Sequence, residues 1–158
     1  MATQAPPRAL TDVLRANEIS YELIPHRHTE SAAAEARAVG VDPRHVAKTI
    51  VLRTSQGFAR AVLPASERLD LGKVRAALGD RDVRLASEEL LGKEYAEFEL
   101  GAVPPVGGAH ADPVLVDRRI ARDDAIVFEA GTHGHSVRMK AADLVALARA
   151  RIVDVCKP

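Results

Sequence analysis

The sequence has a single cysteine, no net charge and no long hydrophobic run, and each of these absences excludes a class of protein. Cys156 has no partner in the chain, which excludes an internal disulfide and argues against a thiol nucleophile. The 22 basic and 22 acidic residues cancel, so the chain lacks the positive field of a general nucleic-acid coat protein. Hydrophobic runs fall short of the roughly 18 to 20 residues of a membrane span, and residues 1–7 do not resemble a signal peptide. We therefore predict a cytoplasmic protein without a membrane partner.

The 158 residues fit one domain, which at this size buries roughly two-thirds of its unfolded surface. Hydrophobic residues recur with helical and strand periods in mixed order, and the late strands have hairpin-like spacing. This pattern predicts an α/β (α+β) fold in which a mixed β-sheet is flanked by helices. Residues 1–158 are predicted to form one domain, of which residues 1–7 are expected to be flexible.

The individual elements follow from the same periodicities. Helices are expected at residues 8–16, 31–39, 71–78 and 140–149, with a short one that begins at Ser87. Strands are expected at residues 19–24, 46–52, 58–63, 83–85, 113–117, 125–129, 136–139 and 152–155. Thr29 and Asp70 are the expected N-caps of the second and third helices, which end at Gly40 and Gly79.

Lys48 is a charged residue near the start of an otherwise apolar, β-branched strand. Such a side chain either reaches solvent along its methylene stem or holds an anion inside a cleft. The residues alone leave both interpretations open. The second makes Lys48 the candidate catalytic residue.

Residues 101–108 contain two prolines and three glycines and cannot form regular structure. The prolines fix the shape of the loop beforehand, and its backbone groups have little side-chain cover, so the loop can hold a carboxyl ester or an oxyanion. An ordinary turn between two elements is the alternative. The candidate substrate-binding residues here are Gly101, Ala102, Val103, Pro104 and Pro105.

Two histidine pairs have the same spacing, His26 with His28 and His133 with His135. In an extended chain each pair places two imidazoles on one face, as a zinc site requires. No acidic or cysteine ligand stands at a recognised spacing, so no metal is predicted, and an exposed histidine or one that lines a substrate pocket is preferred. Gly131 precedes His133 closely, and such a turn can project an imidazole into a cleft. Gly131, His133 and His135 are therefore candidate substrate-binding residues.

Asp117 lies at a predicted strand end and is followed by Arg118 and Arg119. A basic edge of this kind can meet RNA phosphates through a local contact, and solvated charges in a turn are the alternative. Other catalytic motifs are missing from the sequence. No serine lies in a nucleophile-elbow context, which leaves Ser-His-Asp catalysis without support, and no phosphate-loop motif is present.

Four segments occur together in a characteristic order and spacing. They are residues 19–23, residues 46–51 around Lys48, residues 69–79 and the loop from Gly101 to Pro105. In this combination the chain resembles the YbaK family, the free-standing relatives of the editing insertion of bacterial prolyl-tRNA synthetase. The resemblance extends from about Leu10 to Val155, and Lys48 with the Gly101-xxx-Pro105 loop is its most specific part.

The resemblance implies a domain that hydrolyses the ester linking a wrong amino acid to tRNA, most often tRNA for proline, without a cofactor. It implies that Lys48 holds the 3′-terminal adenosine or its phosphate, and that the backbone of residues 101–105 positions the aminoacyl carbonyl. Asp117 falls where the synthetase insertions carry an aspartate, and His133 or His135 falls near their pocket histidine. The implied partner is the 3′ end of an aminoacyl-tRNA, with a synthetase or an elongation factor as a further partner and no DNA, and the chain is expected to be a monomer or a weak dimer.

The branch within the family is less well defined by the residues. Residues 128–131 resemble the Cys-tRNA deacylase branch in shape, but that branch has Ser where this chain has Glu129, and Asp where it has Ser136. Residues 130–133 are more similar to a less characterised branch. The resemblance therefore leaves the amino acid that is removed undefined.

Two other functions use the same residues. A non-catalytic module that binds a tRNA end, a nucleotide or a partner synthetase needs the same lysine and loop, and only turnover separates it from an enzyme. A metal-dependent hydrolase built on the two histidine pairs is the other alternative, which metal analysis of the purified protein tests.

Overall fold

The computed structural model describes residues 8–158, so the expected flexibility of residues 1–7 lies outside the described residues. Its helices are α1 (Arg8–Ala16), α2 (Ala32–Val39), α3 (Leu71–Leu78), α4 (Glu88–Glu94), α5 (Arg118–Ala121) and α6 (Ala141–Ala148), with a 3₁₀ turn η1 (Pro43–His45). The strands are β1 (Tyr21–Pro25), β2 (Val46–Thr54), β3 (Gly57–Pro64), β4 (Arg84–Leu85), β5 (Val114–Asp117), β6 (Ala125–Glu129), β7 (His135–Lys140) and β8 (Arg151–Val153). Among the described helices, none has both the length and the apolar character needed to cross a lipid bilayer.

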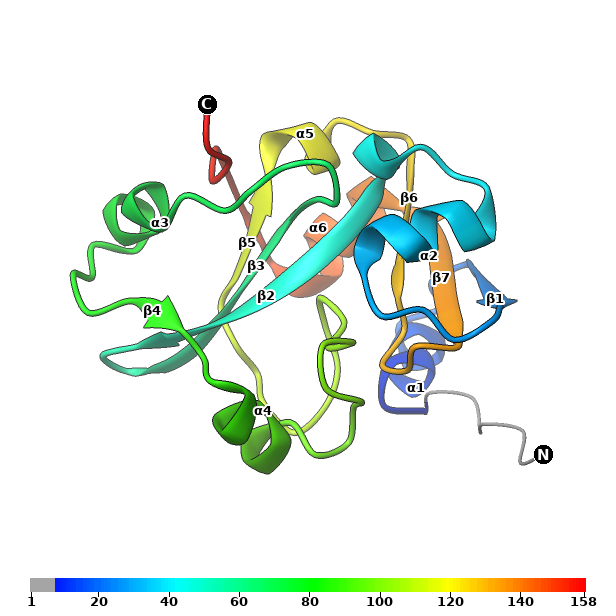
Figure 1. The fold of residues 1–158 in the computed structure, drawn as a ribbon, viewed down its shortest axis with the longest axis horizontal. Coiled ribbons are helices and arrows are strands. Elements are labelled where there is room, and N and C mark those ends of the chain that lie inside the picture. Colours follow the sequence, from blue (N-terminus) through cyan, green and yellow to red (C-terminus); the bar gives the residue numbers. More distant parts are fainter. Residues whose placement is uncertain (1–7) are drawn as a thin grey trace.

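All eight described strands belong to one mixed sheet with the order β1-β7-β6-β2-β3-β5-β8, and β4 pairs with β2 beside this path. The β2–β3 hairpin and the β1–β7–β6 pairs are antiparallel, whereas β2–β6, β3–β5 and β5–β8 are parallel. The sheet and its flanking helices (Figure 1) confirm the predicted fold class.

Helices cover both faces of this sheet. On one face α1 and α6 pack through Leu10, Leu14 and Leu144 onto a core that includes Val62 and Phe128. On the other face α3 packs on the β2–β3 hairpin, and α2 packs on β2 and β6. Figure 1 shows α2 in front of the sheet and α6 behind it.

One edge of β2 is only partly paired. β3 accompanies the other edge along residues 47–54, whereas β6 pairs with β2 only at Val46 and Ala47, and β4 only at Leu52 and Arg53. Between these two partners the described chain places no strand beside residues 48–51. The Val51 carbonyl accepts a hydrogen bond from the Ala86 N–H at 3.1 Å, so the stretch of this edge without a strand partner centres on residues 48–50.

Two local details differ from the expectations. The N-cap of α2 is Ser31 and not Thr29, because the helix begins at Ala32 and the Ser31 hydroxyl accepts a hydrogen bond from the Ala34 N–H at 3.1 Å. The helix α5 was not expected, since four residues are too few for a helical period to show in the sequence.

Candidate active site

A cavity of about 200 Å³ opens at the unpaired part of β2. Its walls come from α2, β2, β6 and the turn at Gly101. The lining residues are Ser31, Ala32, Glu35, Ala47, Lys48, Thr49, Ile50, Gly101, Val103, Phe128 and Glu129. Consecutive residues of a strand point to opposite faces of a sheet, so four consecutive lining residues in β2 show that the cavity meets this strand at its edge.

Lys48 lines this cavity with a partly buried side chain. Burial lowers the pKa of its ammonium, and the negative charge of the nearby Glu67 opposes that shift. In the part of the chain that the structure describes, the Lys48 side chain makes no hydrogen bond or ion pair. An ammonium in a cavity lining that makes no hydrogen bond or ion pair within the described chain is available to an anionic ligand.

The turn at Gly101 forms another wall of the cavity. Gly101 has a φ of +84°, in the left-handed region where a side chain is unfavourable. Gly101 and Val103 line the cavity, whereas Ala102, Pro104 and Pro105 are buried behind it. The structure therefore brings Lys48 and two of the five predicted loop residues to one cavity, and it assigns the other three to the support of the loop.

Arg60 anchors this loop from the core, and the sequence interpretation missed it. Its side chain is 1% exposed and donates hydrogen bonds to the carbonyls of Pro104 and Gly107, both at 2.8 Å. It also forms an ion pair with Asp112 at 2.9 Å, and the Tyr95 hydroxyl donates to the same carboxylate at 2.7 Å. The partners of the guanidinium all follow the Gly101 turn, so one buried arginine fixes the segment after it, and Tyr95, which precedes the turn, joins this anchor through Asp112.

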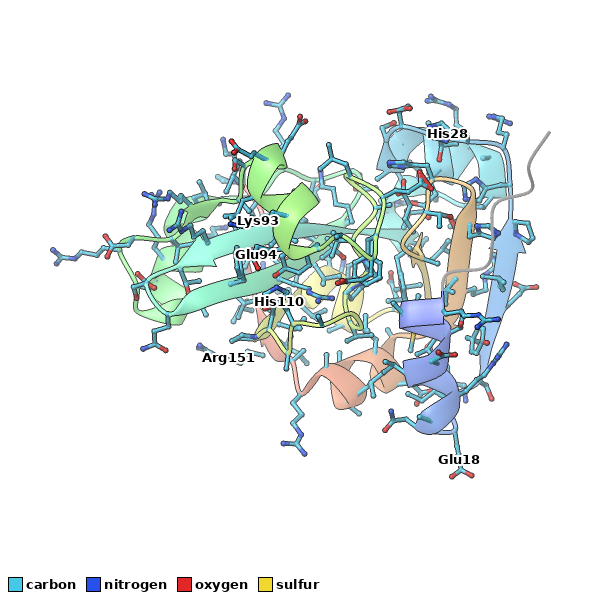
Figure 2. The ribbon with its side chains drawn as sticks, turned by 90° about the horizontal axis from the view of Figure 1, so that it is seen from below. Glu18, His28, Lys93, Glu94, His110 and Arg151 are labelled. Atoms are coloured by element: carbon cyan, nitrogen blue, oxygen red, sulfur yellow. The ribbon has the colours of Figure 1, made fainter. Side chains whose placement is uncertain are left out.

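An arginine inside the apolar strand of residues 58–63 was the available signal, of the same kind as Lys48. His110 extends the anchor toward the surface. Its ring stacks on Tyr95 with centroids 4.7 Å apart, and it lies 3.5 Å from Glu94 of α4 (Figure 2).

Two carboxyl groups, from Glu35 of α2 and Glu129 at the end of β6, line the same cavity. Glu35 is 0% exposed, and its Oε2 accepts a hydrogen bond from the Ser136 hydroxyl at 2.5 Å. Burial raises the pKa of Glu35 to about 7, although the Ser136 bond opposes the shift. Burial also raises the pKa of Glu129 to about 8, with a further rise from the nearby Glu35. The cavity thus has an acidic floor that the sequence interpretation did not foresee.

His133 lies behind this floor and not in the cavity lining. Its Nε2 is 2.6 Å from the Leu100 carbonyl, which only accepts, so Nε2 carries the proton. Its Nδ1 lies 3.1 Å from Oε2 of Glu129 but lacks hydrogen-bond geometry to it. The ring also lies 3.6 Å from the position that a Cβ on Gly101 would occupy. His133 therefore supports the Gly101 turn and the Glu129 wall from behind.

Asp117, Gly131 and His135 also lie outside the cavity lining. Asp117 is fully buried at the N-terminus of α5, where it accepts hydrogen bonds from the N–H groups of Arg119 and Val155, both at 2.9 Å. Its carboxylate is thus committed to a helix cap and to the C-terminal segment. Gly131 has a φ of +98° and shapes the turn before β7, and His135 pairs with Thr132 at 2.7 Å.

The histidine pairs form no metal site among residues 8–158. The group with metal-ligand spacing there is Asp117, Asp154 and Cys156, which contains no histidine. Asp154 in that group already forms ion pairs with Lys73 at 3.1 Å and Arg119 at 3.3 Å. A metal ion at this position would have to displace two cations, so the group reads as a charge cluster of the fold.

Comparison with known proteins connects this architecture to one family. A family model described as "Aminoacyl-tRNA editing domain" matches residues 26–147. "Uncharacterized protein YwhH" of Bacillus subtilis is 26% identical over 133 residues, which are 82% of this chain and 83% of that protein. "Putative Cys-tRNA(Pro)/Cys-tRNA(Cys) deacylase EbsC" of Enterococcus faecalis is 23% identical over 126 residues, which are 79% of this chain and 76% of that protein.

A solved structure shows the same fold. It is titled "Crystal structure of a putative trans-editing enzyme for prolyl tRNA synthetase", and it superposes with a TM-score of 0.86 over 99% of this chain and 100% of that chain. The sequence identity is 24%, so the likeness concerns the fold. The cavity at the edge of β2 lies entirely within the part matched by the family model.

Proposed function

The chain belongs to the aminoacyl-tRNA editing domain family, and from this premise we propose that it is a trans-acting deacylase for mischarged tRNA. The family match confirms the resemblance seen in the sequence. The proposed reaction is hydrolysis of the ester that joins a wrong amino acid to the tRNA 3′ end, with tRNA for proline as the proposed tRNA. A second hydrolytic site of this kind is needed because a synthetase pocket rejects an amino acid smaller by one methylene by only about 1 to 3 kcal/mol.

The observation that supports the proposal is that Lys48 and the Gly101 turn line one cavity. The unpaired ammonium suits the phosphate or ribose of the 3′-terminal adenosine. The turn, held by Arg60, presents its backbone to the aminoacyl carbonyl. A rigid backbone turn positions a carbonyl without reorganisation during the reaction, which is the requirement for transition-state stabilisation.

A second cavity of about 310 Å³ adjoins the first cavity, and we propose that it binds a nucleoside. The two cavities share Thr49, Ile50, Gly101 and Val103. The remaining walls of the second cavity are apolar and come from Val51, Leu85, Ala86 and Leu91. We assign the terminal adenine to this apolar half and the aminoacyl group to the half with Lys48 and the two carboxyls.

The proposed nucleophile is water. Cys156 is fully buried outside the cavity lining, and burial together with the hydrogen bond to Asp117 raises the pKa of its thiol to about 12. A neutral, buried thiol does not attack an ester. In the proposed step water adds to the carbonyl, the carbon–oxygen ester bond breaks, and the ribose oxygen takes a proton, with help from the substrate's own groups.

Release of free amino acid from a panel of mischarged tRNAs tests the proposal. Lys48→Ala is expected to lower the rate at least about tenfold, because a lost charge-assisted contact costs roughly 1.5 to 3 kcal/mol. Lys93→Ala on α4 (Figure 2), where the side chain is exposed, is the matched control and should leave the rate unchanged. If the protein bound these tRNAs but released no amino acid from any of them, the deacylase proposal would be wrong and the non-catalytic binding module would be supported.

Activity is expected to survive a strong chelator. The cavity lining offers two carboxylates but no histidine or cysteine, whereas a catalytic zinc needs three protein ligands. The measurement is the deacylation rate before and after incubation with EDTA. Loss of activity that zinc restores would contradict the expectation and support the metal-dependent hydrolase.

A further inference from the structure

We propose that Glu35 and Glu129 bind the free α-amino group of the aminoacyl ester, so that the site accepts aminoacyl-tRNA and rejects tRNA whose amino acid is N-acylated. The inference rests on the proposed deacylase function and names its substrate class. Peptidyl-tRNA and other N-blocked esters fall outside that class.

The first observation is the placement of the two carboxyls. Glu35 lies on the stripe of α2 that packs against the sheet, next to Ala36, which contacts Val46 and Val127. Glu129 comes from β6, a different element, and its side chain is 11% exposed. Both enter one cavity, and within the described chain neither forms an ion pair with Lys48. Helix packing therefore directs two acidic groups into a cavity whose lysine, Lys48, forms an ion pair with neither of them in the described chain.

The second observation is that Oε1 of Glu35 is buried without a hydrogen bond in the described chain. Oε2 of Glu129 also makes no hydrogen bond there, although it lies 3.1 Å from Nδ1 of His133. Most buried polar atoms in proteins are hydrogen-bonded, and an unpaired one is costly, so each such atom calls for an explanation. A carboxylate oxygen is satisfied by a donor, and an ammonium offers three donors together with the opposite charge.

Charge complementarity identifies the donor. The cavity lining combines a cation, Lys48, with two carboxyls, Glu35 and Glu129. An aminoacylated tRNA end carries the complementary charges, an anionic phosphate on the nucleotide and a cationic amino group on the amino acid. The α-ammonium is the one cationic donor that every free aminoacyl ester carries, whatever its side chain. An amide nitrogen in an N-acylated ester is neutral, has one N–H and adds bulk to a cavity of about 200 Å³.

The hydrogen bonds next to Glu35 hold its carboxyl in place. The Ser136 oxygen lies 2.5 Å from Oε2 of Glu35 and 2.9 Å from Nε2 of His26. Nδ1 of His26 lies 2.7 Å from the Arg27 carbonyl, so Nδ1 carries a proton. The single proton of the Ser136 hydroxyl is donated to Glu35, so Oε2 is held as an acceptor and Oε1 is left for the ligand.

The test compares one mischarged tRNA that the protein hydrolyses with the N-acetylated form of the same tRNA. Each rate is divided by the rate of spontaneous hydrolysis of that substrate, because free-amino esters are intrinsically labile. The wild type is expected to accelerate the free-amino form at least about tenfold more than the acetylated form. Glu35→Gln and Glu129→Gln should each lower the acceleration of the free-amino form about tenfold and leave that of the acetylated form within about twofold.

Glu89→Gln, an exposed change on α4, is the matched control and should alter neither rate. Equal acceleration of the two forms by the wild type would overturn the amino-group site while the deacylase stands. If the wild type released no amino acid from any substrate, the deacylase would fail. Recognition is then measured by calorimetry with adenosine that carries an alanine in a stable 3′-amide, free or N-acetylated. Binding of the free amine at least about tenfold more tightly supports the site, and equal affinities overturn it.

Discussion

Replacement of Arg60 by alanine is expected to lower the free energy of unfolding by about 3–5 kcal/mol, because the change leaves the carboxylate of Asp112 buried without its cation. The side chain of Asp112 is only 6% exposed, so water does not replace the guanidinium. The carbonyls of Pro104 and Gly107 lose their donors at the same time. Deacylation should fall with stability, since the segment that follows the Gly101 turn loses its anchor.

Chemical denaturation of the variants measures this effect. Arg53→Ala in β2, where the side chain is exposed, is the matched control and should change the free energy of unfolding by less than about 0.5 kcal/mol. Adding Asp112→Asn to Arg60→Ala should restore part of the loss, because the orphaned charge is then gone. Activity should stay low in that double variant, because the two carbonyl contacts are still missing. A loss below about 1 kcal/mol in Arg60→Ala would show that the ion pair does not hold the loop.

The parts of the site that the sequence predicted are those where a residue conflicts with its local pattern. Lys48 is a charge in an apolar strand, and residues 101–105 are a loop too rich in proline and glycine for regular structure. Conflicts of this kind between a residue and its local pattern are expected at functional or strained sites. The structure brings Lys48, Gly101 and Val103 to one cavity through the unpaired edge of β2. That edge depends on where β6 and β4 stop, which no local pattern contains.

Glu35 carried the same kind of signal and was missed. Ala32, Glu35, Ala36 and Val39 follow the helical period of one face, so a carboxylate stood within a packing stripe. The alanines around Glu35 predict close packing of this helix, and that pattern obscured the single charge. The sequence around Glu129 did not indicate a buried carboxyl, because the last residue of a strand is commonly polar. Its burial results from contact between α2 and β6, which is tertiary.

Asp117 and His133 were predicted in the site through the resemblance, and the structure gives both a supporting position. Asp117 immediately precedes α5, a helix too short to detect, and becomes its N-cap. For His133, the left-handed conformation of Gly131 turns the chain so that the imidazole meets Leu100 and Glu129 from behind the cavity wall. The conformation of a glycine turn decides between lining and supporting a cavity, and residue types alone do not fix it.

Replacement of Glu129 by glutamine is expected to make the protein more stable at high pH. The pKa of the Glu129 carboxyl is about 8 in the folded protein and near 4.5 when the carboxyl is exposed in the unfolded chain. Between these two pH values the folded state therefore binds more protons than the unfolded state. Stability changes with pH in proportion to the protons bound by the unfolded state minus those bound by the folded state, and this difference is negative here. The contribution of Glu129 is therefore fully favourable below pH 4.5 and is lost as the pH rises to about 8.

Glutamine has the shape of the protonated carboxyl and does not titrate, so the variant avoids that loss. The gain should be near zero at pH 5 and reach roughly 2 to 4 kcal/mol at pH 9, after allowance for relaxation around the buried charge. Thermal unfolding of both proteins between pH 5 and pH 9 measures it, with Glu89→Gln as the exposed control. Parallel stability curves for Glu129→Gln and wild type would show that the carboxyl is not buried as a neutral acid. A widening difference would show that the empty site holds a proton where the proposed substrate brings its ammonium, since a ligand that supplies the missing cation makes the charged carboxylate favourable.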